Sequence, residues 1–230
     1  MKKRGKFIVL EGIDGSGKDT QFRLLQKRFK KEGYRFLLAD FPRYYDSRWG
    51  ELVGHFLAGE FGSLKGVSPY LAALPYMLDE YTWTRDIGIP WIEKGGLIIS
   101  NRYFTSNVHQ IAKLKTSSQK KYRDWLWTAG YKDLGILKPD LVIFVATPPH
   151  VAKELINYKK KRAYLKKRKK DIAEKDWHHQ ESAYREYKRT VKMNRWWVEV
   201  SGVKDYRKDF TKSIHKDIWK IVSSKMLKQR

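Results

Sequence analysis

The sequence lacks cysteine altogether and has no long apolar run among its 230 residues. Without cysteine the chain can form neither a disulfide framework nor a thiolate site. No apolar run approaches the ~20 residues that a membrane-spanning helix needs. The apolar run near the start, residues 7–10, is shorter than the ~7–15 residues of a signal-peptide core, and an acidic residue follows it. These absences predict a protein without a membrane anchor, and they fit a cytoplasmic location.

Acidic residues are scarce relative to basic ones: 25 Asp and Glu stand against 49 Lys and Arg, which gives a formal net charge of +24. Such a surplus is typical of nucleic-acid-binding proteins and of enzymes that act on polyanionic nucleotides. Hydrophobic residues make up 41% of the chain, so a disordered basic tail protein is excluded. Composition therefore leaves a nucleic-acid binder and a nucleotide enzyme open.

Short apolar runs alternate with longer helical stretches. The runs are rich in Ile, Val, Leu and Phe, as is typical of strands buried on both faces, and they cover residues 7–10, 36–39, 97–100, 141–145 and 196–200. The helical stretches cover residues 20–32, 69–94, 107–129, 149–165, 173–194 and 210–227. This alternation predicts a single α/β domain over residues 1–230, with a five-stranded parallel sheet and helices on both of its faces.

Residues 12–18 match the G-x-x-x-x-G-K pattern of a phosphate-binding loop. The pattern follows a predicted strand and precedes a predicted helix, where backbone N–H groups and the helix N-terminus can surround a phosphate while Lys18 reaches the terminal phosphates. We expect ATP to contact Gly12, Gly15, Ser16, Gly17, Lys18, Asp19 and Thr20. Asp19 stands where Ser or Thr normally binds Mg²⁺, so either its carboxylate addresses the metal or the handling of Mg²⁺ is altered.

Several further segments carry a specific resemblance. FIVLEGIDGSGKDTQ at the first loop, DFPRY at 40–44 and NRYFTSN at 101–107 together resemble the thymidylate kinase family of nucleoside monophosphate kinases. Residues 68–81, 138–149 and 169–176 extend the similarity over most of the chain. The resemblance implies a P-loop NTPase fold of three layers, α/β/α, with a basic lid at about residues 150–175. It also implies ATP and a nucleoside monophosphate as substrates, Mg²⁺ as cofactor, and a homodimer.

The resemblance assigns roles to residues at matching positions. Asp14 would bind the 3′-hydroxyl of the acceptor sugar, and Arg43 and Arg102 would hold the acceptor phosphate, for which a planar guanidinium is well suited. Tyr76 would stack on the base. The expected substrate-binding residues are Asp14, Phe41, Arg43, Tyr76, Glu80, Arg102, Asn107 and Gln110, the last two offering amide groups to the base or sugar edge.

The lid is expected to supply a catalytic cation. The phosphate-binding loop has no basic residue besides Lys18, whereas residues 159–170 hold nine basic residues and no acid. Of the two arginines there, Arg162 is favoured over Arg168 because it continues the preceding helix. The expected catalytic residues are thus Lys18, Asn101, Arg102 and Arg162.

Three positions depart from the family pattern. Asn101 and Ala146 stand where the family has Asp, and Glu80 stands where it has an arginine that contacts O4 of thymine. Asp19 with Asn101 keeps the formal charge of the usual pair, so we hypothesise a relocated Mg²⁺ ligand. Glu80 could accept from an exocyclic amino group and shift specificity toward a cytosine-type or modified base. Alternatively, Arg85 supplies the missing cation, or Glu80 pairs with a neighbouring arginine.

The favoured function is ATP-dependent phosphorylation of a deoxynucleoside monophosphate, with dTMP converted to dTDP. One alternative is a kinase with altered base specificity. Another is a catalytically weak homologue that senses nucleotides or binds nucleic acid, for which nine tryptophans and fourteen tyrosines offer stacking surfaces. The intact Gly12, Gly17 and Lys18 favour nucleotide binding over nucleic-acid binding.

Overall fold

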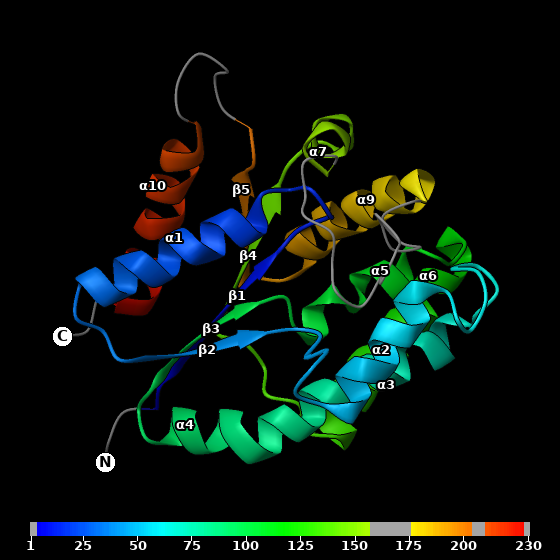
Figure 1. Ribbon diagram of the computed structural model, residues 1–230, viewed down its shortest axis with the longest axis horizontal. Helices are drawn as coiled ribbons and strands as arrows, with labels where there is room; N and C mark the ends of the chain where they lie inside the picture. Colours follow the sequence, from blue (N-terminus) through cyan, green and yellow to red (C-terminus); the bar gives the residue numbers. More distant parts are fainter. Residues whose placement is uncertain (1–3, 157–175, 204–209, 228–230) are drawn as a thin grey trace.

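The computed structural model describes residues 4–156, 176–203 and 210–227, and its centre is a five-stranded sheet (Figure 1). The strands run in the order β2-β3-β1-β4-β5, and each strand pairs with its neighbours in parallel. Their bounds are Lys6–Glu11 for β1, Phe36–Asp40 for β2, Leu97–Asn101 for β3, Leu141–Ala146 for β4 and Trp197–Ser201 for β5. The predicted five-stranded parallel sheet is confirmed, and every strand overlaps the apolar run that predicted it.

Side chains of β1 alternate between two hydrophobic clusters, one on each face of the sheet. Phe7 and Val9 belong to one cluster and Ile8 and Leu10 to the other, and all four are fully buried. A strand buried on both faces belongs at the centre of a parallel sheet. β1 accordingly lies between β3 and β4, and its carboxyl end is where the phosphate-binding loop begins.

Helices α1 (Lys18–Lys31) and α10 (Phe210–Val222) cover one face of the sheet (Figure 1). Leu25 of α1 and Ile218 of α10 are fully buried in the same cluster as Ile8 and Leu10. A short π-helical turn, Ser223–Leu227, follows α10. The apolar side chains of these two helices therefore form one outer layer of the fold.

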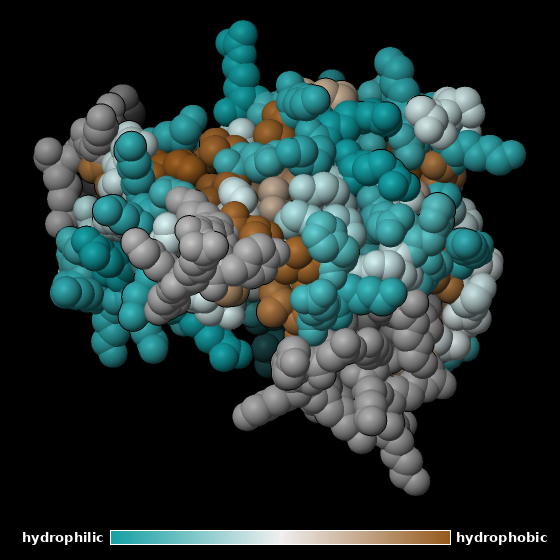
Figure 2. Space-filling model, turned by 90° about the horizontal axis from the view of Figure 1, so that it is seen from above, coloured by the Kyte–Doolittle hydropathy of each residue, from teal (hydrophilic) through white to brown (hydrophobic). Residues whose placement is uncertain are grey.

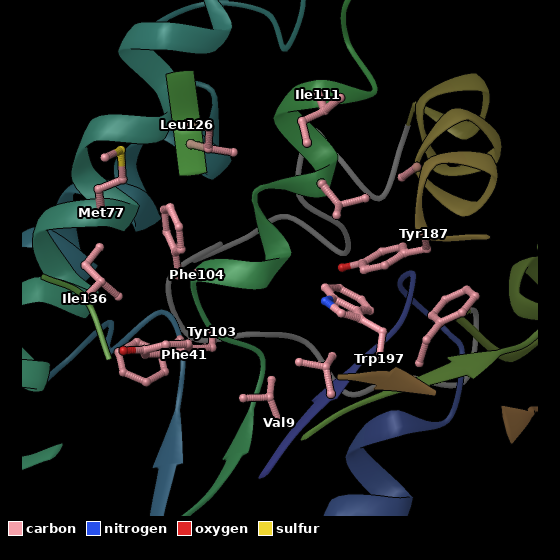
Figure 3. Close-up of a cluster of buried hydrophobic side chains, with 14 of the residues drawn as sticks. Val9, Phe41, Met77, Tyr103, Phe104, Ile111, Leu126, Ile136, Tyr187 and Trp197 are labelled. Atoms are coloured by element: carbon pink, nitrogen blue, oxygen red, sulfur yellow. The ribbon is translucent and has the colours of Figure 1, made fainter. Parts of the chain in front are cut away.

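The other face is covered by α3 (Pro69–Trp83), α5 (Val108–Ile111), α6 (Thr116–Trp127) and α9 (Trp177–Met193). Figure 3 shows side chains from these helices in the larger cluster, among them Met77, Ile111, Leu126 and Tyr187. The Tyr187 ring stacks on Phe144 of β4 at 4.9 Å between centroids. Helices on both faces of the sheet give the expected three layers.

Two of the predicted helices are divided in the structure. The stretch 69–94 consists of α3, a π-helical turn at Thr84–Gly88 and α4 (Ile89–Glu93). The stretch 107–129 begins in a 3₁₀ turn at Phe104–Asn107, continues as α5, and resumes after extended Lys115 as α6, which runs on into a π-helical turn, Thr128–Asp133. The apolar pattern runs through the break because α5 and α6 bury side chains in the same cluster.

Two further helices border the carboxyl edge of the sheet. α2 (Arg48–Ala58) begins at Ser47, whose Oγ accepts from the backbone N–H of Trp49 and Gly50, and it packs on α3. α7 (Pro149–Ile156) follows β4. The predicted continuation of this helix to residue 165 and the predicted lid with Arg162 lie outside the described residues.

Most of the face seen in Figure 2 is hydrophilic, with hydrophobic side chains gathered in bands between the hydrophilic ones. This agrees with the high content of charged residues, 32% of the chain. Among the described helices, none has the length and apolar character required to cross a membrane.

Glu80 is a buried acid inside the fold rather than a surface residue. It lies in α3, is 2% exposed, and its Oε2 has no hydrogen-bond partner within the described residues. Burial raises the pKa of its carboxyl group well above the usual range, and the negative charges of Asp79 and Glu11 raise it further. Burial and these two charges thus favour the protonated form of the Glu80 carboxyl group in the folded protein.

This placement predicts how Glu80→Gln changes the pH dependence of stability. In the native protein the free energy of unfolding should fall as pH rises above about 4.5 toward the raised folded pKa, because only the unfolded chain then releases the Glu80 proton. The slope from this one group is up to about 1.4 kcal/mol per pH unit. Glu80→Gln should remove this slope of the unfolding free energy with pH, whereas Glu93→Gln, at an exposed position on α4, should leave it unchanged. Urea unfolding between pH 5 and pH 8 measures the difference, and parallel curves for the two variants would contradict the prediction.

Candidate active site

The phosphate-binding loop joins β1 to α1 and has a backbone that requires glycine. Gly15 and Gly17 have φ values of 80° and 84°, in the left-handed region that L side chains rarely adopt. A Cβ at Gly15 would also lie 2.3 Å from the carbonyl oxygen of Ala152 in α7. Ser16 is buried, its Oγ has no partner in the described parts of the chain, and its carbonyl accepts from Thr147. The loop is thus held between the sheet and α7.

Two cations converge on the carboxylate of Asp14 within this loop. Lys18 Nζ lies 3.9 Å from Asp14 Oδ1, and Arg102 Nη2 donates to the same oxygen at 2.6 Å. Gln180 of α9 fixes Asp14 from the other side, donating to Oδ2 at 3.0 Å and accepting from the Asp14 backbone N–H at 3.2 Å. One buried acid therefore links the phosphate-binding loop to the residue that follows β3.

Arg102 is held in a strained backbone conformation. Its φ is 60°, and a non-glycine residue in this region costs about 1–2 kcal/mol. Burial lowers the pKa of its guanidinium, but the carboxylates of Asp14 and Glu11 raise the pKa by more, so Arg102 stays charged. Strain that surrounding contacts maintain is typical of functional positions.

Glu11, the last residue of β1, anchors the segment after β3. It is fully buried, and its carboxylate accepts from Thr105 Oγ1 at 2.6 Å, Ser106 Oγ at 2.8 Å and Tyr187 Oη at 2.8 Å. Arg102 Nη1 lies 3.9 Å from the same group. Charge-assisted hydrogen bonds of this kind are about twice as strong as neutral ones. The sequence reasoning missed Glu11 and Gln180; the acid directly before the loop was the available signal for Glu11.

Arg43 is bound to α3 by four hydrogen bonds. Its backbone N–H and Nε donate to Asp79 at 2.9 Å each, and Nη2 donates to the Asp79 carbonyl and to Thr82 Oγ1. Its neighbours Pro42 and Tyr44 line the pockets described below, whereas Arg43 is not among their lining residues. The role of Arg43 toward the acceptor phosphate stays a prediction, and Asp79 is the residue that orients it.

Asp19 and Asn101 lie together, as the relocation hypothesis requires, and a third residue joins them. Asn101 Nδ2 donates to Asp40 Oδ1 at 2.9 Å and is 3.4 Å from Asp19 Oδ1. The position of Asp40 follows from the register of the sheet, in which Asp40 at the end of β2 lies beside Asn101 at the end of β3. Burial raises the pKa of the Asp40 carboxyl group; the hydrogen bond from Asn101 lowers it, and the charge of Asp19 raises it. Asp19, Asp40 and Asn101 line a cavity together with Lys18 and Arg23.

This corner suits a magnesium ion that is bound together with a phosphate. Asn101 Oδ1 is buried and has no partner within the ranges described, so one oxygen ligand is free for a cation. Asp19 and Asp40 supply carboxylates, and Mg²⁺ is usually held by one or two carboxylates with substrate phosphates and water. No cluster of three His, Cys, Asp or Glu residues that could hold a metal occurs in the described ranges. Thr20 is exposed on the first turn of α1.

A second pocket opens beside Asp14 and Arg102, between α2, α3, α5 and α9. The structure brings five of the predicted substrate-binding residues to its lining: Asp14, Tyr76, Arg102, Asn107 and Gln110. Phe56, Leu57 and Leu64 form its apolar part. We call it the acceptor pocket. It ends at the same Asp14 that Lys18 approaches, so it adjoins the phosphate-binding loop.

Glu80, Phe41 and Arg85 are not among the lining residues of the acceptor pocket. Glu80 is buried in the core, so the structure does not support the predicted contact with a base. Phe41 lines the neighbouring cavity at Asp19 and packs on Tyr103 (Figure 3). Arg85 is exposed and pairs with Asp86 at 2.6 Å, so the missing cation is not supplied from there.

Comparison with known proteins places this site in a family. The family model described as thymidylate kinase matches residues 10–214. The probable thymidylate kinase of Thermococcus gammatolerans is 32% identical over 158 residues, which cover 66% of this chain and 71% of that protein. The thymidylate kinase of Mycobacterium tuberculosis is 30% identical over 149 residues, 64% of this chain and 68% of that protein.

A solved structure agrees with these sequence matches at the level of the fold. The thymidylate kinase of Candida albicans superposes with a TM-score of 0.68 at 20% identity, covering 96% of this chain and 92% of that one. The family match spans the phosphate-binding loop, the Asp14–Arg102 pair and every lining residue of the acceptor pocket. The chain belongs to the thymidylate kinase family.

Proposed function

We propose that this protein transfers the terminal phosphoryl group of ATP to dTMP, producing ADP and dTDP. The observation that carries the proposal is the convergence of Lys18 and Arg102 on one oxygen of Asp14. Lys18 belongs to the loop that binds donor phosphates, and Arg102 lines the pocket for the acceptor. A cation from each side at one point is what in-line phosphoryl transfer between two bound phosphates requires.

The residues of the site divide the work of transfer. Backbone N–H groups at Gly15 and Gly17 and the ammonium group of Lys18 bind the donor phosphates. Arg102 and Arg43 bind and orient the acceptor phosphate, and Asp14 keeps Arg102 charged and in place. When bound, Mg²⁺ supplies positive charge to the donor phosphate oxygens.

Asp19, Asp40 and Asn101 are the residues that would hold the metal. The predicted lid cation Arg162 belongs to the same proposal; it would reach the transferred group from the lid. Lid closure over the nucleotides would exclude water from the transfer step.

The position of Glu80 supports dTMP over a cytosine-type acceptor. A base switch through Glu80 requires its carboxylate in the acceptor pocket, whereas Glu80 is buried in the core and does not line that pocket. Burial also reduces the stacking surface on which the nucleic-acid alternative relies, and leaves Tyr45 and Trp49 among the exposed aromatic side chains. Trp83 and Trp197 are buried, and Trp125, Trp127 and Trp196 pack against the same cluster.

Exposed apolar side chains on α3 support the homodimer that the family resemblance implies. Tyr70, Leu71 and Leu74 are 39%, 63% and 43% exposed. Neighbouring apolar side chains that remain in water favour burial against another protein surface. We propose that a second copy of this chain covers them.

A panel of acceptors tests the proposed reaction. Release of ADP from ATP and Mg²⁺ should be fastest with dTMP, slower with dUMP, and slowest with dCMP and dGMP, because the chain belongs to the thymidylate kinase family and Glu80 offers no contact for a cytosine-type base. A coupled assay on the purified protein measures all four. Absence of ADP release with every monophosphate, together with salt-sensitive binding of oligonucleotides, would instead support the nucleic-acid-binding alternative.

Arg102→Lys should lower kcat with dTMP by on the order of 100-fold, because lysine cannot keep both Asp14 and a phosphate on one planar group. Arg85→Lys is the matched control. Arg85 is exposed and pairs with its neighbour Asp86, so the kcat and KM of this variant should equal those of the unaltered protein. Steady-state kinetics of ADP release compare the two. Equal losses of kcat in both variants would show that Arg102 has no specific role in the reaction.

Asp19→Ser should raise the Mg²⁺ concentration needed for half-maximal activity by on the order of 10-fold, because one carboxylate is lost from the metal corner. Adding Asn101→Asp to that variant returns the carboxylate at the adjacent position and should restore most of the Mg²⁺ affinity. Titration of activity with Mg²⁺ measures both changes. If the double variant regains nothing, Asp19 and Asn101 do not compensate for one another.

A further inference from the structure

Lys113 places a buried ammonium group at the acceptor pocket. It follows α5, and its Nζ is buried without any hydrogen-bond partner in the described part of the chain. Nζ lies 4.9 Å from the centroid of the Phe56 ring, and Phe56 lines the acceptor pocket. The ammonium group is therefore on the pocket side of Lys113.

The surroundings leave the Lys113 side chain charged but without a hydrogen-bond acceptor among the described residues. Burial lowers its pKa to about 8, so the ammonium form still dominates at neutral pH. No acidic side chain among residues 4–156, 176–203 and 210–227 forms an ion pair with it. The nearby His179 has a pKa lowered to about 4, chiefly by burial and further by the charge of Lys113, so it is neutral. A donor in this condition needs an acceptor beyond these described residues, and a bound nucleotide can supply one.

Two more unpartnered polar atoms lie on the same stretch of chain. Asn107 Oδ1 and Gln110 Oε1 are buried without partners among the described residues, and both residues line the acceptor pocket. Asn107 Nδ2 donates to the carbonyl of Phe104 at 3.0 Å, which leaves its oxygen as the free end of the amide. Asn107 ends the 3₁₀ turn, Gln110 lies in α5 and Lys113 follows α5, and all three line the acceptor pocket.

We propose that Lys113 reads the base of the acceptor: its Nζ donates to the carbonyl oxygen at position 4 of the pyrimidine, while an amide oxygen of Asn107 or Gln110 accepts from N3–H. Lys113 thereby replaces the arginine that the family carries where this chain has Glu80. This inference rests on the proposed function, because it concerns the acceptor of that reaction.

The chemistry selects a uracil-type edge. Thymine presents an acceptor at position 4 and a donor at N3, which match an ammonium donor and an amide acceptor. Cytosine presents an amino group at position 4 and an unprotonated N3, so a donor would face a donor and an acceptor would face an acceptor. Both mismatches leave buried polar groups unpaired, which is the strongest way for a site to reject an analogue.

Three variants test the proposal. Lys113→Met keeps the shape of the side chain and removes the donor, Lys113→Arg keeps a donor, and Lys120→Met removes a lysine whose side chain is 84% exposed on α6. Lys113→Met should raise KM for dTMP by about 10-fold or more with little change in kcat or in KM for ATP. Lys113→Met should also lower the ratio of kcat/KM for dTMP to kcat/KM for dCMP. Lys113→Arg should keep most of the affinity, and Lys120→Met should match the unaltered protein.

An altered substrate locates the contact at position 4. In 4-thio-dTMP a weakly accepting sulfur replaces the oxygen at position 4 while N3–H is kept. The unaltered protein should bind it more weakly than dTMP, whereas Lys113→Met should bind the two alike. Equal KM values for dTMP and 4-thio-dTMP in the unaltered protein would overturn the proposal, even if Lys113→Met failed to fold.

The same measurements separate this inference from the proposed function. If the unaltered protein releases no ADP with dTMP, the proposed function fails. If it does, and Lys113→Met keeps KM for dTMP within about twofold or raises KM for dTMP and dCMP equally, only the role of Lys113 is wrong.

Discussion

The site depends on buried carboxylates at the carboxyl end of β1. Glu11 accepts hydrogen bonds from Thr105, Ser106 and Tyr187, and so fixes the segment after β3 and helix α9 to the central strand. Asp14, three residues on, holds Arg102 and faces Lys18. Carboxylates this deeply buried are tolerated only when donors and cations surround them. Each of these contacts therefore fixes an element of the site as well as satisfying a charge.

The strained backbone of Arg102 follows from the same constraint. Its guanidinium is placed between Asp14 and Glu11, and a residue with φ of 60° is stable only where neighbouring contacts outweigh the conformational cost. The segment from Thr105 to Lys113, anchored by Glu11, supplies one wall of the acceptor pocket. In the proposed reaction the acceptor phosphate and its base would therefore both contact one short stretch of chain after β3.

Positions that depart from the family pattern have counterparts close by in space. Asn101 stands where the family has an acid before Arg102. It contacts Asp19 on α1 and Asp40 on β2, so oxygen ligands remain at the proposed magnesium site. The arginine expected at the position of Glu80 is absent, and Lys113, in the turn after α5, lines the acceptor pocket with a buried ammonium group. In both cases the chemical group needed is offered by a neighbouring element, as sites assembled from several elements permit.

Local sequence patterns were enough to predict the sheet and the phosphate-binding loop, and the family resemblance supplied five lining residues of the acceptor pocket. Buried strands and a glycine-rich loop before a lysine are local patterns, because each follows from the conformations that neighbouring residues can adopt. The pairing of Asp19 with Asn101 was also predictable, since Asn101 ends β3, Asp19 lies in the first turn of α1 after β1, and these two strands are neighbours.

The remaining features of the site became visible only in the folded protein. It showed that Glu80 faces the core, that Asp79 holds Arg43, and that Asp40, Gln180 and Lys113 join the site. Gln180 is 166 residues away from Asp14 along the chain, and nothing in either local sequence encodes their contact. Whether a polar side chain faces a pocket or the core depends on packing between helices, and packing is a property of the folded whole.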